Sequence, residues 1–183
     1  MLGRDLTVTF QSRFGRAKWL EPATDATLAA LPDDLTGTVL VTMGDVPLLQ
    51  GETLVALAEE HASSGSAVTV ITSVLPDAKA YGRIVRAADG SVERIVEFKD
   101  ATDAQREIRE INSGIYAFDA QVLRRELANV TSDNAQGEKY LTDVIGIARR
   151  EGRKVVAHLV DDLWQTEGVN DRVQLALLGK ILN

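Results

Sequence analysis

TVLVTMGDVP, residues 38–47, is the stretch that most directly predicts how the chain folds. Its first half, Thr38–Thr42, is a continuous apolar and β-branched run of the kind found in strands buried on both faces. Glu52–Ser63 then places apolar residues on one face and acids on the other, as an amphipathic helix does. Ala67–Thr72 is a second buried run. A strand, a helix and a strand in this order predict an α/β sheet with parallel strands.

Beyond this unit the apolar pattern shortens and alternates. Gly82–Arg86 and Ser91–Glu97 predict a hairpin, because Asp-Gly between two such runs is a strong turn signal. The other predicted elements are strands at Leu6–Gln11, Ile111–Phe118 and Lys154–Val160, and helices at Asp25–Leu31, Ala120–Leu127, Leu141–Glu151 and Asn170–Leu182. We therefore expect one α/β domain.

The composition excludes several classes of protein. The chain has 183 residues, enough for one domain with a core, and no cysteine, which excludes disulfides, cysteine zinc sites and thiol nucleophiles. A formal charge of -7 argues against a nucleic-acid partner, because phosphate backbones require a basic surface. No apolar run approaches the ~20 residues of a membrane-spanning helix, and no signal peptide opens the sequence. We expect a cytoplasmic protein that binds neither nucleic acid nor membrane.

The first candidate site residue is Asp45, which directly follows a predicted strand. Open α/β sheets bind ligands at the carboxyl ends of their strands, and Gly44 would let a ligand approach the backbone. A carboxylate there suits Mg²⁺, which proteins hold through one or two oxygens plus substrate phosphates. A simple turn explains Gly-Asp and the following proline equally well, so the pattern alone leaves both interpretations open.

Two further candidates lie at the ends of the predicted hairpin strands. Gly82 could present its backbone N–H to a ligand, and Glu97 could accept hydrogen bonds from sugar hydroxyls. In isolation, each pattern favours the simpler interpretation, which is a strand entry for Gly82 and a solvated strand end for Glu97.

Two asparagines complete the set of candidates. Asn112 interrupts an apolar predicted strand, so its amide must be hydrogen-bonded, and its donor and acceptor suit an acetamido or hydroxyl group. Because Gly114 clears space beside it, we expect a ligand contact in preference to an internal network. Asn170 is placed to N-cap the last helix, which is the leading local interpretation. Its side-chain oxygen could instead be a metal ligand.

Three longer stretches, taken together and in order, carry a family resemblance. They are ATDAQREIREINSG at 101–114, NAQGEKYLTDV at 134–144 and GVNDRVQL at 168–175. With the segments above, they resemble the uridyltransferase domain of the bifunctional N-acetylglucosamine-1-phosphate uridyltransferase / glucosamine-1-phosphate acetyltransferase family, GlmU, most closely its actinobacterial form. The resemblance runs from about Leu31 to the end of the sequence.

The resemblance implies a fold and a reaction. The fold is a Rossmann-like mixed α/β sheet of the nucleotide-diphospho-sugar transferase type. The reaction joins UTP and N-acetylglucosamine 1-phosphate into UDP-N-acetylglucosamine and pyrophosphate, a step of cell-wall precursor synthesis that relies on Mg²⁺ and on positioning. A related pyrophosphorylase for another sugar is an alternative against which Asn112 and the stretch 101–114 argue.

The resemblance also implies a role for each candidate residue. Asp45 and Asn170 match the pair that holds Mg²⁺ at the catalytic centre. The residues that match substrate contacts are Met43 and Gly44 for the nucleoside, Gly82, Glu97 and Asn112 for the N-acetylglucosamine moiety, Thr142 near the sugar phosphate, and Gln11 for the uracil.

The sequence also departs from the family pattern. The family opens with a strand and a Leu-Ala-Ala-Gly-x-Gly-Thr-Arg-Met loop that wraps the triphosphate. Neither that loop nor the Leu-Gly-Thr-Gly-His-Ala motif expected after Gln11 is present, and residues 12–19 read SRFGRAKW instead. The β-helix acetyltransferase domain, through which the family trimerises, is absent too.

From these departures we expect residues 1–183 to form a partial, N-terminally truncated uridyltransferase domain that lacks the first strand and the nucleotide loop. Such a domain would not trimerise and would be weakly active or inactive by itself. The alternative is a non-catalytic truncated module that binds sugar nucleotide without turning it over.

Overall fold

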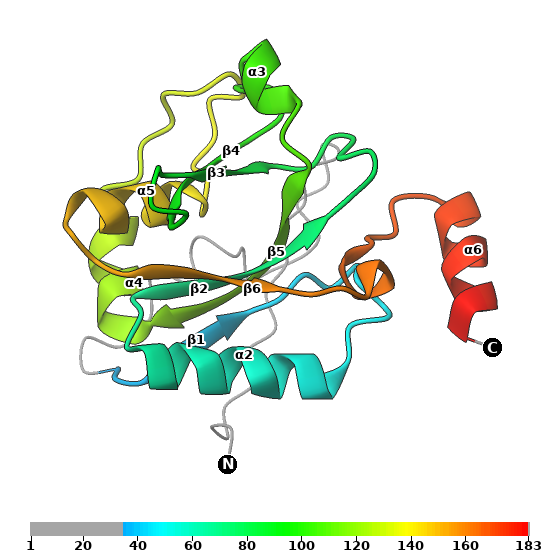
Figure 1. Ribbon diagram of the computed structural model, residues 1–183, viewed down its shortest axis with the longest axis horizontal. Coiled ribbons are helices and arrows are strands. Elements are labelled where there is room, and N and C mark those ends of the chain that lie inside the picture. The colour runs from blue at the N-terminus through cyan, green and yellow to red at the C-terminus, as the bar shows by residue number, and fades with distance from the viewer. Residues whose placement is uncertain (1–34, 183) are drawn as a thin grey trace, which may run out of the picture.

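The computed structural model describes residues 35–182 (Figure 1). Its strands are β1 (Thr38–Val41), β2 (Val68–Val74), β3 (Arg83–Arg86), β4 (Val92–Val96), β5 (Glu110–Asp119) and β6 (Val155–Leu159). Its helices are α2 (Gly51–Ser64), α3 (Asp103–Arg106), α4 (Ala120–Leu127), α5 (Asp143–Arg150) and α6 (Arg172–Leu182), with a 3-10 turn η1 (Leu163–Thr166). The predicted strand Leu6–Gln11, the predicted helix Asp25–Leu31 and the candidate Gln11 lie outside the described residues.

One mixed sheet organises the molecule, with the strand order β4-β3-β5-β2-β6. β5 is antiparallel to β2 on one side, and on its other side it pairs with β3 through its first residues and with β1 through its last. β2 and β6 are parallel to each other. Hence β1, β2 and β6 all run in the same direction, and their carboxyl ends lie at one edge of the sheet. That edge is where open α/β sheets bind their ligands.

The predicted strand-helix-strand unit has an additional strand inside it. β1 and β2 are parallel, as expected, but they are not neighbours, because Tyr116 of β5 pairs with Val41 of β1 and with Val70 of β2. Periodicity identifies strands but not their neighbours, and the strand that fills this gap comes much later in the chain. The mixed α/β sheet expected from the resemblance is confirmed, with β5 antiparallel to both flanking strands.

Helices cover both faces of the sheet (Figure 1), and β5 supplies side chains to both cores. Tyr116 and Phe118 join the core beneath α4 and α5, while Ile115 and Ala117 join the core beneath α2, where Leu57 is fully buried. This alternation follows from the two-residue period of a strand. Each large apolar side chain buried in this way stabilises the fold by about 1.5–3 kcal/mol.

The short helix α3 and the turn η1 were not predicted. α3 begins with a capping box, in which Thr102 Oγ1 accepts from Gln105 N and Gln105 Oε1 accepts from Thr102 N. Thr-x-x-Gln is a known start signal for a helix, so this helix could have been recognised from the sequence.

Across the described part of the chain, no helix has the length and apolar character needed to cross a bilayer.

A buried polar cluster lies at the carboxyl end of α2. His61 is 5% exposed, and its Nδ1 lies 3.0 Å from Thr69 Oγ1 and 3.2 Å from Ser66 Oγ. Burial lowers the pKa of His61, and the nearby Asp119 carboxylate opposes that shift. The folded state therefore favours the neutral imidazole.

We expect this cluster to make stability depend on pH. Because the pKa of His61 is lower in the folded chain than in the unfolded chain, its contribution is complete above the unfolded pKa of about 6.5 and is lost as the pH falls below that value. Urea denaturation at about pH 7.5 and about pH 5.5 measures this loss of unfolding free energy.

Two variants isolate the effect of His61. His61→Asn keeps a polar atom close to the position of Nδ1 but does not titrate, so its stability should depend less on pH than that of the wild type. Ser63→Ala, at an exposed position of the same helix, removes no titratable group and should retain the wild-type dependence. An undiminished pH dependence in His61→Asn would contradict the assignment.

Candidate functional site

Asp45 lies in the loop that follows β1, where the carboxyl ends of β1, β2 and β6 lie together. Its backbone carbonyl accepts a 2.8 Å hydrogen bond from the N–H of Val169. A Cβ at Gly168 would lie 3.5 Å from Asp45 Oδ2, an ordinary contact distance, so the two segments lie close to each other. This contact brings the loop of Asp45 next to the segment that carries Asn170, although the two are distant in the sequence.

Asn170 does not cap α6, so the leading sequence interpretation is wrong. Asp171 is the cap, because its Oδ1 accepts from the N–H groups of Val173 and Gln174 at 2.8 Å each. The backbone N–H of Asn170 donates to Gln174 Oε1 at 2.6 Å, and Asn170 itself is exposed. Two adjacent residues with similar cap propensity cannot be told apart from the sequence. The Asn170 side chain therefore does not act as the helix cap.

Gly82 and Glu97 meet across the β3–β4 hairpin. A Cβ at Gly82 would lie 3.5 Å from both carboxylate oxygens of Glu97 and 3.1 Å from Ile95 Cγ2. Glu97 Oε1 also accepts a 3.4 Å hydrogen bond from Thr142 Oγ1, at the start of α5. Three candidates from separate parts of the sequence therefore form one cluster.

Asn112 joins this cluster through the sheet. Its backbone N–H donates to Gly82 O at 2.9 Å. Its side chain is 9% exposed, and Oδ1 accepts from Gly114 N at 3.0 Å and from the Tyr116 hydroxyl at 2.9 Å. The internal network that we did not favour from the sequence thus exists, but it uses the amide oxygen, and among the described residues the Nδ2 group makes no hydrogen bond.

Gly114 is required by the backbone and by its neighbour Met43. Its φ is +82°, and a Cβ would lie 2.9 Å from Met43 Cγ. Met43 therefore packs directly against β5, beside Asn112. Gly44, by contrast, is exposed, and no described atom lies within 4 Å of the place where its Cβ would be, so a ligand has room to approach the backbone there.

Tyr81 connects the two halves of the site and was not singled out from the sequence. It directly precedes Gly82, and its hydroxyl accepts a 3.4 Å hydrogen bond from Gly168 N. Burial raises the pKa of Tyr81; the bond from Gly168 opposes the shift, and Glu167 and Asp45 add to it. The adjacency to Gly82 was a visible signal, but the contact with Gly168 depends on the fold.

A pocket of about 410 Å³ opens beside Glu97. Asp100, Tyr140 and Asp143 line it, together with Arg94. Burial raises the pKa of Asp143, with Arg150 opposing the shift. Carboxylates and a phenol accept and exchange hydrogen bonds with hydroxyl groups, so this wall suits a polyhydroxylated ligand.

The donor set near Asp45 fits a hard divalent cation that is also held by its substrate. Asp45 offers a carboxylate and Asn170 an amide oxygen, both oxygen donors of the kind Mg²⁺ prefers. The described part of the chain has no group of three or more His, Cys, Asp or Glu residues that could hold a metal without further ligands. Mg²⁺ suits such a sparse site, because substrate phosphates and water usually complete its coordination.

Comparison with known proteins gives consistent matches. Residues 22–170 match the family described as nucleotidyl transferase. The bifunctional protein GlmU of Pseudarthrobacter chlorophenolicus is 60% identical over 163 residues, which cover 88% of this chain and 33% of that protein. The bifunctional protein GlmU of Mycobacterium marinum is 52% identical over 183 residues, which cover 100% of this chain and 36% of that protein. The chain thus spans about a third of the length of these relatives.

A solved structure supports the fold. It is a Bacillus anthracis protein assigned as a glucose-1-phosphate thymidylyltransferase and crystallised with sucrose, and it superimposes with a TM-score of 0.58 at 16% identity. The match covers 80% of this chain and 55% of that one. At this identity the likeness concerns the fold alone.

The resemblance to actinobacterial GlmU that the sequence motifs indicated is confirmed by the GlmU relatives described above.

We predict that Gly114→Ala lowers the free energy of unfolding by about 1–2 kcal/mol from left-handed backbone strain alone, with a further loss because the new methyl group displaces Met43. Urea denaturation measures the change. Gly146→Ala is the matched control, since Gly146 lies within α5 and its Cβ would meet its neighbours at 3.5 Å and 3.7 Å. That change should be neutral or stabilising. Wild-type stability of Gly114→Ala would show that the site tolerates a side chain beside Met43.

Proposed function

The chain belongs to the nucleotidyl transferase family, and from its likeness to bifunctional GlmU proteins we propose that it handles UTP and N-acetylglucosamine 1-phosphate, the substrates from which UDP-N-acetylglucosamine and pyrophosphate form. The observation that carries this proposal is the gathering of Gly82, Glu97 and Asn112 into one cluster beside the loop of Asp45. Cell-wall precursor synthesis in the cytoplasm is the setting that the proposal implies.

The sugar cluster suits an N-acetylated hexose. Glu97 offers carboxylate oxygens to hydroxyl groups, and Gly82 lies beside that carboxylate, where a Cβ would be 3.5 Å from both oxygens. The two hydrogen bonds from Gly114 N and the Tyr116 hydroxyl occupy Asn112 Oδ1 and orient the amide. Asn112 Nδ2 is then the group that meets the ligand, and as a donor it complements the carbonyl oxygen of an acetamido group.

Asp45 and Asn170 are the residues that would hold Mg²⁺. When bound, the metal would neutralise charge on the phosphates. The chain's own contribution would be to hold the segments that carry these two residues against each other, through the bond from Val169 N to the Asp45 carbonyl. Both residues lie at the sheet edge that also carries the sugar cluster.

The proposed reaction is an in-line displacement at phosphorus. A phosphate oxygen of N-acetylglucosamine 1-phosphate forms a bond to the α-phosphorus of UTP, and the bond from that phosphorus to the bridging oxygen breaks, so that pyrophosphate leaves with the electron pair. No proton transfer to carbon and no covalent enzyme intermediate is needed. Glu97, Asn112 and Thr142 would orient the sugar phosphate, while Met43 and Gly44 would contact the nucleoside.

The 183-residue sequence contains no Gly-x-Gly-Thr-Arg-Met stretch for the triphosphate. We therefore expect this chain by itself to bind sugar nucleotide and to release pyrophosphate very slowly or not at all. A coupled pyrophosphate assay with UTP, N-acetylglucosamine 1-phosphate and Mg²⁺ measures the rate. Binding without any release would support the non-catalytic module, and turnover of about 1–1,000 per second, ordinary for enzymes, would refute the expectation of weak activity.

We further predict that Asp45→Ala abolishes the Mg²⁺-dependent part of UDP-N-acetylglucosamine binding, because the metal loses its charged ligand. Calorimetric titrations with Mg²⁺ and with a chelator measure that part. Glu59→Ala, which removes an exposed carboxylate from α2, is the control and should bind as the wild type does. Unchanged metal dependence in Asp45→Ala would rule out the role given to Asp45.

A further inference from the structure

Arg83, the first residue of β3, is a buried cation whose partners are backbone carbonyls. It is 2% exposed, and its side-chain hydrogen bonds go to backbone carbonyls. Its Nε donates to Arg106 O at 3.3 Å, and Nη2 donates to Lys79 O at 2.9 Å. Its Nη1 donates to Ala78 O at 3.2 Å and also to Tyr81 O. A planar guanidinium with several fixed N–H groups is suited to such a cage of carbonyls.

The carbonyls of the cage belong mostly to one loop, residues 78–81, between β2 and β3. This loop turns sharply: Tyr81 N donates to Ala78 O at 3.2 Å, and Lys79 has a φ of +44°, which is strained for a residue with a side chain. Without the guanidinium, the carbonyls that point into the turn would lose their donors. Arg83 therefore stabilises the conformation of the loop that leads into Gly82.

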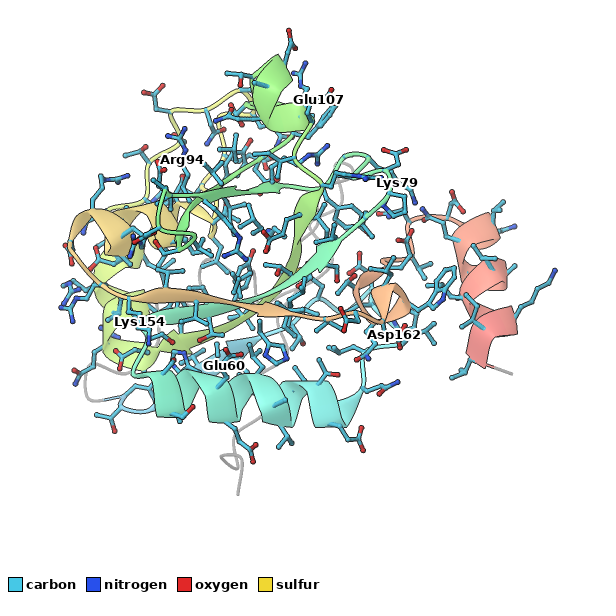
Figure 2. The ribbon with its side chains drawn as sticks, in the orientation of Figure 1. Glu60, Lys79, Arg94, Glu107, Lys154 and Asp162 are labelled. Carbon is cyan, nitrogen blue, oxygen red and sulfur yellow. The ribbon has the colours of Figure 1, made fainter. Side chains whose placement is uncertain are left out.

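The same loop reaches the segment beside Asp45. Figure 2 shows Lys79 at the outer end of the loop, and its Nζ lies 3.3 Å from Glu167 Oε1. The Tyr81 hydroxyl accepts from Gly168 N. The loop thus contacts the segment 167–169, which Val169 N also ties to the Asp45 carbonyl.

Arg83 also contacts Phe98, which follows Glu97 in the turn after β4. Its guanidinium carbon lies 5.5 Å from the centre of the Phe98 ring, and that of Arg106 lies 5.0 Å from the same centre. The negative face of an aromatic ring attracts a cation. Two arginines therefore hold Phe98, the residue next to Glu97. Phe98 and the loop 78–81 flank the pair formed by Gly82 and Glu97.

We propose that Arg83 is a positioning residue for the sugar-phosphate site, which it supports through the loop 78–81 and Phe98 without touching the substrate. The proposal rests on the proposed function in its binding consequences, but not in its structural ones. A lysine cannot replace Arg83, because its single ammonium nitrogen cannot reach all the carbonyl oxygens that the three separate guanidinium nitrogens bind.

The test compares Arg83→Lys with Arg86→Lys, a control in the same strand whose arginine pairs with Glu110 on the surface. Hydrogen exchange of the unliganded chains should be faster in Arg83→Lys at the amides of Tyr81 and Gly168, and unchanged in Arg86→Lys. Calorimetry should show an affinity for N-acetylglucosamine 1-phosphate that falls about tenfold to a hundredfold in Arg83→Lys, with the affinity for uridine monophosphate within about twofold of the wild type.

Each outcome decides the proposal. Wild-type exchange at Tyr81 and Gly168 in Arg83→Lys, or equal losses of affinity for both ligands, would overturn it, the second because a general loss of structure affects both alike. If the wild type binds no N-acetylglucosamine 1-phosphate, the proposed function fails and the exchange measurement alone decides the positioning role.

A second variant covers the case in which Arg83→Lys does not fold. Tyr81→Phe keeps the guanidinium cage and removes the hydroxyl that meets Gly168 N. It should speed exchange at Gly168, leave exchange at Tyr81 unchanged and weaken sugar-phosphate binding. Unchanged exchange at Gly168 and unchanged affinity would overturn the proposed route through the loop.

Discussion

The backbone hydrogen bonds of β5 are the constraint on which the rest of the structure depends. This strand pairs with β1, β2 and β3, so three strands from different parts of the chain take their positions from it. The same pairing places the Asn112 N–H against the Gly82 carbonyl and the alternating side chains of 115–118 in both cores. A shift of β5 by one residue would exchange the two cores and separate the sugar cluster.

Much of this arrangement could be predicted from local patterns, and the part that could not depends on pairing. The apolar runs at 38–42 and 111–118 correctly predicted the strands β1 and β5, because strands in a sheet select apolar and β-branched residues. The expectation that the first strand is buried on both faces is wrong, since Thr38 is exposed and Val39–Val41 are half-buried. The residue types did not show that β1 and β5 are neighbours in the sheet. Asn170 was predicted to cap the last helix, but Asp171 does so, and both residue types suit that position. The link from Tyr81 to Gly168 is a contact across the fold, which neither spacing nor composition encodes.

The candidate site shows how small residues and buried hydrogen bonds work together. A side chain at Gly82 would meet Ile95 at 3.1 Å, and one at Gly114 would meet Met43 at 2.9 Å. The absence of side chains at these two positions lets the start of β3 lie close to β4 and lets Met43 lie against β5. The hydrogen bonds of the Asn112 oxygen then leave a defined donor group beside that space, so the polarity of the site follows from its packing.

Recognition of the acetamido group is the property that most directly distinguishes the proposed sugar site from a general sugar-phosphate site. Calorimetric titration with N-acetylglucosamine 1-phosphate and with glucose 1-phosphate, which lacks that group, measures it. Because Asn112 Nδ2 is oriented by two hydrogen bonds to Oδ1, we expect a preference of about tenfold or more for the acetylated sugar, or about 1.4 kcal/mol, and its loss in Asn112→Asp. Equal affinities of the wild-type chain for the two sugar phosphates would contradict the assignment of Asn112 and of the cluster around it.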